Sequence, residues 1–261
     1  MNVRTIPCLS DNYAYVLVQD GHAVVIDPSE EGPVTVALGD PALGGLVLDA
    51  IWLTHHHWDH VGGVEGLLAE HPVPVVGSRY DLDQDRIIGQ TVAVDDGATL
   101  PFGGMTARIH TVPGHTLGAV AIEIAGNLFT GDTLFAGGCG RVFEGTLPMM
   151  RASLAKLRAL DPALRVWCGH EYTIKNLEFA EAMSAEAGVP EPAVSARLAE
   201  ARAQRARGET TVGHPLADEL ATNPFLRWDA PAVRAAAARM GADPDDPDAV
   251  FAALRNAKDR W

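Results

Sequence analysis

The sequence predicts an α+β fold, in which helices cover β-sheets, followed by a small helical C-terminal domain. Up to about Tyr172 the chain consists of short apolar runs broken by Gly, Pro and Asp, which is typical of strands mixed with helices. After that point the chain is rich in alanine and has a helical apolar period. We therefore expect a mixed domain at residues 1–172 and a helical domain at residues 173–261. Because 47% of the 261 residues are hydrophobic, the chain can bury a full core.

Apolar runs of strand length recur through the first domain, and several of them end on a polar residue or a histidine. The runs expected to form strands are 13–18, 23–28, 49–55, 73–78, 106–115, 120–132 and 165–172. Between them, 64–72 and 148–160 have helical periodicity. Open α/β sheets bind their ligands at strand ends, so these polar ends are candidate positions for a site.

The last third contains four helical stretches separated by Gly and Pro breaks. We expect helices within 174–188, 192–208, 230–241 and 247–261. The segment ADPDDPD at 242–248 supplies Asp and Pro for the start of the last helix.

Charge and cysteine usage exclude several classes of protein. The net charge of -14 opposes the phosphate attraction on which nucleic-acid binding depends, and it disfavours anionic membrane surfaces. No apolar run has transmembrane length, and residues 1–18 lack the apolar stretch of a signal peptide. Cys8, Cys139 and Cys168 form no C-x-x-C pair, which argues against a disulfide framework or a cysteine zinc site. We expect a cytoplasmic monomer that binds neither nucleic acid nor membrane.

The segment WLTHHHWDHVGG, Trp52–Gly63, concentrates four histidines and one aspartate in six positions. In an extended chain, residues two apart point the same way, so His55 and His57 share a face. Asp59 and His60 then lie in the following turn or helix start. Imidazole and carboxylate are ligands that zinc, iron and manganese accept. The spacing predicts two ligand pairs for two neighbouring metal ions, and a solvated polar loop explains so dense a cluster less well.

Further ligands must come from other strand ends or tight turns. His115, Asp132 and His170 each follow an apolar, strand-like run. Taken singly, each fits ordinary turn chemistry, and the Gly-Asp pair at Asp132 fits it particularly well. Taken together, they supply the ligands that a two-metal site would still lack.

The series T-H-x-H-x-D-H, G-H-T, G-D and G-H resembles the motifs of the metallo-β-lactamase superfamily. The resemblance implies an αββα sandwich that holds two divalent metal ions, with zinc preferred over iron or manganese. It implies a first ion held by His55, His57 and His115, a second held by Asp59, His60 and His170, and Asp132 bridging the two. Asp27 matches the strand-end aspartate that supports the ligands in this superfamily, and a simple Asp-Pro turn explains it equally well. The histidines that match no ligand position are expected to be structural or solvated: His22, His56, His71, His110 and His214.

Two metal ions that share one water predict hydrolysis. They lower the pKa of that water toward neutrality and so provide hydroxide as the nucleophile at pH 7. They also polarise a carbonyl group and stabilise the developing oxyanion. No G-x-S-x-G elbow occurs, and no cysteine lies in a nucleophile motif. The predicted reaction is therefore hydrolysis of an acyl or phosphoryl bond.

Blocks distributed over the whole chain resemble a narrower family, glyoxalase II or hydroxyacylglutathione hydrolase. These blocks are THHHWDHVGG, LFAGGCGRVFEGT, CGHEYTIKNLEFA, TNPFLR and LRNAKDRW. The resemblance implies hydrolysis of S-(2-hydroxyacyl)glutathione, typically S-D-lactoylglutathione, to glutathione and D-lactate, a step of methylglyoxal detoxification. It also implies that the helical C-terminal region completes the glutathione site.

An acidic protein needs local cations to hold glutathione, which carries two carboxylates. Matched to the motifs of the family, the expected glutathione contacts are Arg141, Tyr172, Arg255 and Lys258, with Asn176 as a weaker candidate. Arg255 and Lys258 share a face of a predicted helix, although a solvated helix face is the commoner fate of such a pair. The chain departs from the family at Phe143, where Tyr is frequent, so we expect one substrate hydrogen bond to be missing.

Several other functions are compatible with the same fold. A glutathione persulfide dioxygenase with one iron is the principal alternative, although that type generally lacks so long a helical extension. A di-iron, flavodoxin-linked reductase typically carries Glu at the position of His57. A nuclease is disfavoured by the acidic charge and by the lack of a basic, aromatic-rich region. A non-catalytic binding module would be expected to have lost a ligand, and all seven ligand positions are occupied here.

Overall fold

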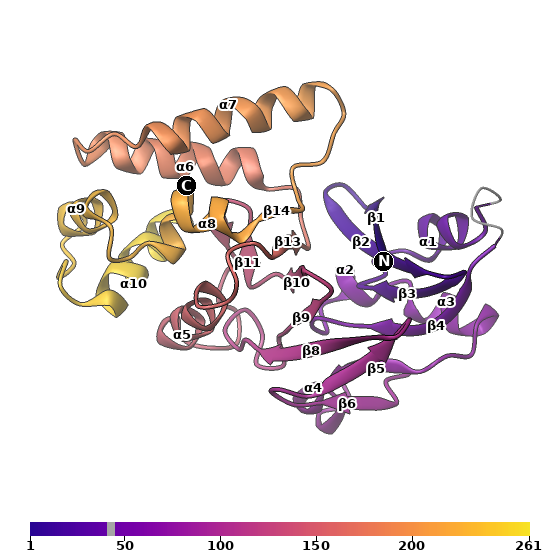
Figure 1. Cartoon of the computed structure of the whole chain (residues 1–261). Helices are drawn as coiled ribbons and strands as arrows, with labels where there is room; N and C mark the ends of the chain where they lie inside the picture. Colours follow the sequence, from indigo (N-terminus) through magenta and orange to yellow (C-terminus); the bar gives the residue numbers. More distant parts are fainter. Residues whose placement is uncertain (41–44) are drawn as a thin grey trace. The chain divides into compact units, whose positions relative to one another are not determined.

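The computed structural model describes residues 1–40 and 45–261, and the chain divides into two compact units (Figure 1). Unit 1 comprises Met1–Thr111 and Thr116–Gly131, and unit 2 comprises Val112–His115 and Asp132–Trp261. The boundary predicted at residue 172 lies inside unit 2. The predicted boundary follows from a change in amino-acid composition, whereas the two units follow from the compactness of the folded chain. The division at residue 172 stays a prediction.

The first sheet of unit 1 has six strands in the order β1 to β6. Its strands are β1 (Asn2–Cys8), β2 (Asn12–Gln19), β3 (His22–Ile26), β4 (Val47–Trp52), β5 (Val75–Ser78) and β6 (Val92–Val94). The first three pair antiparallel, and β3 to β6 pair parallel. Parallel neighbours place their carboxyl ends at the same edge of the sheet, so the chain leaving β3 emerges beside the chain leaving β4.

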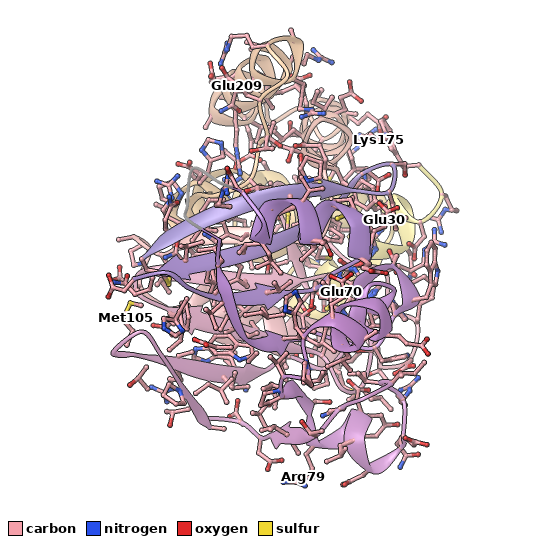
Figure 2. All side chains as sticks on the ribbon, turned by 90° about the vertical axis from the view of Figure 1, so that its right-hand side faces the viewer. Glu30, Glu70, Arg79, Met105, Lys175 and Glu209 are labelled. Atoms are coloured by element: carbon pink, nitrogen blue, oxygen red, sulfur yellow. The ribbon has the colours of Figure 1, made fainter. Side chains whose placement is uncertain are left out.

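Helices connect the parallel strands of this sheet. They are α1 (Glu31–Leu38), α2 (Trp58–Val61), α3 (Val64–Glu70) and α4 (Arg79–Asp83). Val34 and Leu38 of α1 and Leu67 of α3 pack in one buried cluster with Val25 and Ile51 of the sheet. Figure 2 views the protein from the side of these two helices, with Glu30 labelled before α1 and Glu70 at the end of α3.

The second sheet of unit 1 contains β7 (Thr99–Phe102), β8 (Met105–Thr111), β9 (Val120–Ile124) and β10 (Asn127–Gly131), all antiparallel. The run 120–132, which we expected to form one strand, is a hairpin. The residues between its strands, Ala125 and Gly126, have φ of 46° and 77°. Such a left-handed pair fits the tight turns that join antiparallel strands, and the apolar period alone does not reveal it.

Aromatic residues fill the space between the two sheets of unit 1. The ring centroids of Tyr15 on β2 and Phe129 on β10 lie 5.3 Å apart. Those of Trp52 on β4 and Phe102 on β7 lie 6.4 Å apart, edge to face. All four side chains are buried. Such pairs contribute about 0.5–1.5 kcal/mol each beyond the area that they bury, so they help to hold the two sheets together.

Unit 2 is mainly helical, as expected for the last third of the chain. Its elements are β11 (Leu134–Phe135), β12 (Gly138–Cys139), α5 (Leu147–Arg158), β13 (Arg165–Cys168), α6 (Thr173–Glu186), α7 (Pro192–Ala206), β14 (His214–Pro215), α8 (Leu216–Thr222), the 3-10 helix Pro224–Leu226, α9 (Pro231–Arg239) and α10 (Pro247–Lys258). The four predicted C-terminal helices correspond to α6, α7, α9 and α10. Asp246 caps α10 by accepting a hydrogen bond from the Asp248 N–H at 2.9 Å, and Pro247 begins the helix, which confirms the predicted start.

Within residues 1–40 and 45–261, no helix combines the length and the apolar character needed to cross a lipid bilayer.

Candidate active site

Polar residues meet where the parallel strands β3 and β4 end. Asp27 follows β3 and Thr54 follows β4, and both are buried. The Asp27 carboxylate accepts hydrogen bonds from the Thr54 N–H at 2.8 Å and from the Thr54 hydroxyl at 2.5 Å. Asp27 has φ of 49°, in the left-handed region, so the chain turns sharply there. These contacts fix the start of the histidine loop to the neighbouring strand end.

The loop after Thr54 gathers three histidines of the predicted ligand set. The ring centroid of His55 lies 4.7 Å from that of His57 and 4.2 Å from that of His60. His60 lies on the separate short helix α2, whereas the expected places were the turn and the start of the following helix. The imidazole of His56 turns instead toward Asp81, with Nδ1 3.4 Å from the carboxylate. The predicted alternation along this loop is therefore confirmed.

Hydrogen bonds at Nδ1 orient two of these imidazoles. Nδ1 of His60 lies 3.0 Å from the Asp27 carboxylate, and Nδ1 of His55 lies 3.1 Å from the Thr54 hydroxyl. Donation from Nδ1 to a carboxylate fixes the tautomer that offers Nε2 to a metal ion. Asp27, His55 and His60 present ligand-type atoms within 4.8 Å of one another. Since Asp27 already accepts three hydrogen bonds, its position fits a support for the ligands better than a simple turn.

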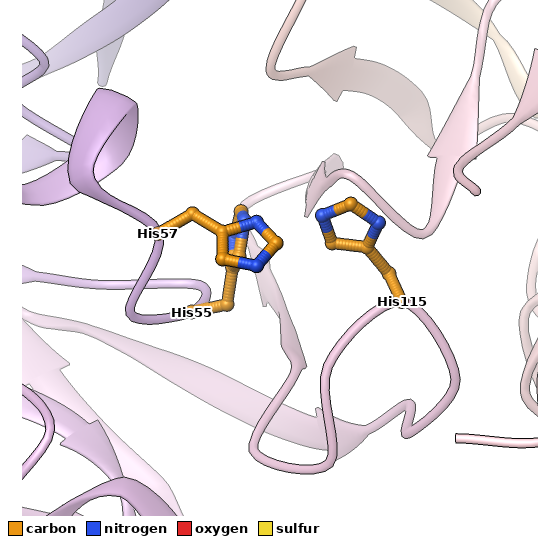
Figure 3. Close-up of side chains that lie close together, drawn as sticks. All are labelled: His55, His57 and His115. Atoms are coloured by element: carbon orange, nitrogen blue, oxygen red, sulfur yellow. The ribbon is translucent and has the colours of Figure 1, made fainter. Parts of the chain in front are cut away.

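Asp59 is held from the other side of the loop. The Asn12 amide donates to the Asp59 carbonyl at 3.0 Å and to its carboxylate at 3.1 Å. Figure 3 shows His55 and His57 on the loop between β4 and α2, and His115 on the loop that follows β8.

Unit 2 brings together the other three predicted ligands. One oxygen of Asp132, Oδ2, lies 3.5 Å from Nε2 of His115 and 3.2 Å from Nε2 of His170. All three residues are buried. Nδ1 of His115 lies 2.7 Å from the Arg141 carbonyl, and this contact directs Nε2 toward Asp132. The ring of His170 stacks on Tyr172, with the centroids 4.7 Å apart and the planes at 4°.

A close backbone approach in unit 2 explains one glycine of the Gly-Cys-Gly turn. A Cβ atom at Gly140 would lie 1.9 Å from the Asp132 carbonyl oxygen and 3.1 Å from Nδ1 of His115. No side chain fits there without moving both residues. Gly140 therefore lets the loop that carries Arg141 pass directly behind two predicted ligands.

The donor set of each unit fits a divalent metal ion. Buried imidazoles and carboxylates, with the second imidazole nitrogen bonded to a carboxylate, hydroxyl or carbonyl, are typical of metal ligands in proteins. The fold and these His/Asp clusters together indicate a divalent metal site.

Histidines and cysteines outside the predicted ligand set pair with carboxylates or are buried. His110 pairs with Glu123 at 2.8 Å, and His22 pairs with Asp49 at 2.9 Å. Among the described residues 1–40 and 45–261, the three buried cysteines form no disulfide. Burial raises the pKa of the Cys168 thiol to about 12, which disfavours the thiolate that a nucleophile would need.

The residues expected to contact glutathione all lie in unit 2, in different surroundings. The side chain of Arg141 is 55% exposed, whereas that of Arg255 is only 6% exposed. Lys258 donates to the Lys175 carbonyl at 2.9 Å and lies 5.2 Å from the centre of the Phe179 ring. Asn176 is buried and donates to the Ala136 carbonyl at 3.1 Å, so it braces the loop between β11 and β12.

Three residues that were not predicted from the sequence contact the predicted site residues. Thr54 and Asn12 anchor the histidine loop, as described above. Asp259 accepts hydrogen bonds from both Arg141 and Arg255. Thr54 and Asp259 stand inside the motifs THHHWDH and LRNAKDRW, which is the one signal that could have drawn attention to them.

Comparison with known proteins agrees with this geometry. Residues 9–170 match the metallo-beta-lactamase superfamily, and residues 171–261 match the hydroxyacylglutathione hydrolase C-terminus. A hydroxyacylglutathione hydrolase of Alkalilimnicola ehrlichii is 50% identical, with 99% of this chain and 98% of the relative covered. One from Synechococcus sp. is 47% identical, with both chains covered completely.

Solved structures share the fold. The crystal structure of ETHE1 from Myxococcus xanthus superposes with a TM-score of 0.68 at 23% identity, covering 98% of this chain and 91% of that one. The crystal structure of TTHA1623 in a di-iron-bound form superposes with a TM-score of 0.53 at 29% identity, covering 65% of this chain and 92% of that one. The predicted fold class is confirmed: a metallo-β-lactamase fold followed by a helical C-terminal domain. The chain belongs to the hydroxyacylglutathione hydrolases, a family of thioester hydrolases within the metallo-β-lactamase superfamily.

Proposed function

We propose that the protein hydrolyses S-(2-hydroxyacyl)glutathione thioesters, with S-D-lactoylglutathione as the reference substrate, at a centre of two divalent metal ions. Membership of the family supports the reaction class. The related structure of TTHA1623 is of a di-iron-bound form, which supports two ions rather than one. We further propose zinc as the resident metal. Iron and manganese are alternatives, because they accept the same imidazole and carboxylate ligands.

The observation that carries the proposal is the sharing of one carboxylate oxygen by two histidines. Oδ2 of Asp132 lies within 3.5 Å of His115 and His170, which the motif series assigns to different ions. A bridging carboxylate would occupy that position. The proposed first ion is held by His55, His57, His115 and Asp132. The proposed second ion is held by Asp59, His60, His170 and Asp132.

Two divalent ions would lower the pKa of a shared water toward neutrality and polarise the thioester carbonyl. The protein's own contribution is to hold its ligands in one protonation state and one orientation. Asp27 and the Arg141 carbonyl do so by accepting from Nδ1 of His60 and His115. The departing group is the thiolate of glutathione. Because a thiolate is a good leaving group, no strong general acid is needed at the sulfur.

The glutathione side of the proposed site is cationic. Arg141, Arg255 and Lys258 supply positive charge for the two carboxylates of glutathione, and Tyr172 and Asn176 lie near His170 in the sequence. We propose residues 1–172 as the catalytic domain and 173–261 as the substrate-binding domain, in a cytoplasmic monomer. The acidic net charge makes this local cluster necessary, because the rest of the surface repels an anion.

The test is hydrolysis of S-D-lactoylglutathione by the purified protein, followed by the loss of thioester absorbance, with metal content measured on the same sample. We expect turnover and two equivalents of divalent metal. A preparation with two metals bound and no turnover would refute the thioesterase assignment. Oxygen consumption with glutathione persulfide, in a preparation with one iron, would support the dioxygenase instead.

A further inference from the structure

Asp259 connects the two arginines of the proposed glutathione side. Its Oδ1 atom accepts from Nε of Arg141 at 3.1 Å and from Nη2 of Arg255 at 3.1 Å. Asp259 caps the C-terminus of α10, and its N–H donates to the Arg255 carbonyl at 3.0 Å. The carboxylate is therefore anchored by its own helix and placed between two guanidinium groups.

The contacts of Arg255 anchor it inside unit 2, where it also donates a hydrogen bond to Asp259. Its Nη1 donates to the Cys139 carbonyl at 2.8 Å, and its guanidinium lies 5.2 Å from the centre of the Phe225 ring. Both terminal nitrogens of Arg255 are engaged inside unit 2, and its side chain is almost buried. It fixes Asp259 in place.

Arg141 has the opposite character. Its side chain is more than half exposed, and its hydrogen bond to Asp259 uses Nε. The terminal nitrogens Nη1 and Nη2 form the second edge of the guanidinium, which can bind a carboxylate through two parallel hydrogen bonds. An exposed arginine loses rotamer freedom when it is ordered. Ordering it in advance reduces the cost of binding a ligand.

We propose that Asp259 is a positioning residue that orients Arg141 toward a carboxylate of the glutathione moiety. Two guanidiniums around one carboxylate leave one positive charge in excess, which a single substrate carboxylate would neutralise. The proposal rests on the proposed function for the identity of the ligand. In this arrangement Arg141 contacts the substrate carboxylate, and Asp259, which is anchored by Arg255, holds the Arg141 guanidinium in position.

Binding of S-methylglutathione, an inert thioether, measures the glutathione side separately from catalysis. Calorimetry would compare wild type, Asp259→Ala, Arg141→Ala and the double variant. We expect Asp259→Ala to weaken binding about three- to tenfold, the range for a hydrogen-bonded ion pair. In the Arg141→Ala background, the same change should weaken binding less than about twofold, because Asp259 then has no Arg141 to orient. For S-D-lactoylglutathione, KM should rise while kcat stays within about twofold.

Asp248→Ala is a matched control, because Asp248 lies on the same helix and forms a partly exposed ion pair with Arg151. It should leave binding unchanged. If Asp259→Ala does not fold, Asp259→Asn, which keeps the shape and removes the charge, replaces it. Unchanged or tighter binding, or an equal loss in both backgrounds, would overturn the proposal, as would a wild type that does not bind S-methylglutathione. A wild type that binds this probe but does not hydrolyse the thioester would refute the proposed function alone.

Discussion

The histidine loop of unit 1 and the cationic cluster of unit 2 are built on different physical principles. In the loop, His55 and His60 are buried, and their Nδ1 atoms are hydrogen-bonded to the Thr54 hydroxyl and to the Asp27 carboxylate, which accepts. In the cluster, Arg141 lies more than half exposed and is oriented by an ion pair. A buried hydrogen-bond network leaves an unsatisfied group when one member is removed, whereas an exposed ion pair is replaced by water.

This difference predicts how the two regions respond to mutation. Changes among the proposed buried ligands and their supports should reduce metal binding and turnover by large factors. Changes in the cationic cluster should alter KM by small factors and leave kcat nearly constant. The proposed chemistry thus depends on rigid, buried groups, whereas recognition also uses the exposed Arg141, a position that tolerates substitution.

Asp132→Ala tests the buried side most strongly. The change removes the carboxylate shared by His115 and His170. We expect metal content to fall below two equivalents and kcat/KM to drop at least about 100-fold. Hydrolysis of S-D-lactoylglutathione with metal analysis on the same sample checks both effects. Full activity of this variant would refute the two-metal centre.

Asp27→Asn tests whether support behind the ligands matters as much as the ligands themselves. The amide keeps the size of the side chain but accepts a hydrogen bond from the His60 imidazole less strongly than a carboxylate does. We expect metal affinity, measured by chelator competition, to fall about 10- to 100-fold. Asp49→Asn is the matched control, since it alters an exposed His-Asp pair in the same unit and should have no effect. Equal metal affinities of Asp27→Asn and Asp49→Asn would show that the buried Asp27 supports metal binding no more than the exposed Asp49 does.

The ligand loop was largely predictable because its residues are contiguous. The two-residue alternation of His55 and His57 follows from local backbone geometry, whereas the separate helix α2 that carries His60 was not expected. The hairpin at 120–132 was missed because a turn at Ala125 and Gly126 depends on left-handed backbone angles, which the apolar period does not report.

The support residues could not be predicted in the same way. Asn12 reaches Asp59 from 47 positions away, and Asp259 reaches Arg141 from 118 positions away. Such contacts depend on how strands and helices pack, and the spacing of residues along the chain does not predict this packing. The motifs identified Arg255 as a candidate, but its burial against Cys139 is a property of the folded unit.

The pH dependence of glutathione binding tests the cationic side. Burial, and next the Arg255 guanidinium, lower the pKa of the Lys258 ammonium to about 8. The other groups that act on Lys258 are Cys139 of β12 and Glu178 and Lys175 of α6. Lys258 is charged below pH 8 and loses its charge above it, so the dissociation constant of S-methylglutathione should rise between pH 7 and pH 8.5.

Lys258→Arg is the control, because a guanidinium stays charged throughout this range. The dissociation constant should therefore rise less with pH in this variant than in the wild type. At pH 8.5 the two rises should differ by about two- to threefold. Unfolding of the protein does not explain a rise in the dissociation constant between pH 7 and pH 8.5. The folded state binds fewer protons at Lys258 than the unfolded state does, so this group makes the free energy of unfolding increase with pH above 8. Identical pH profiles in the two proteins would exclude Lys258 from binding.

Phe143→Tyr should have the smallest effect of these changes. Phe143 is 61% exposed, and its ring centroid lies 5.3 Å from that of His115 and 6.0 Å from the Arg141 guanidinium. A hydroxyl added to an exposed ring can donate to the peptide part of glutathione without leaving a buried group unsatisfied. One such hydrogen bond at an exposed position lies at the low end of the usual range, about 0.5 kcal/mol, so it should lower KM about twofold and leave kcat unchanged. Steady-state kinetics with S-D-lactoylglutathione measure both constants. An unchanged KM would show that Phe143 stands outside the recognition cluster, and an altered kcat would show that the exposed side is coupled to the chemistry after all.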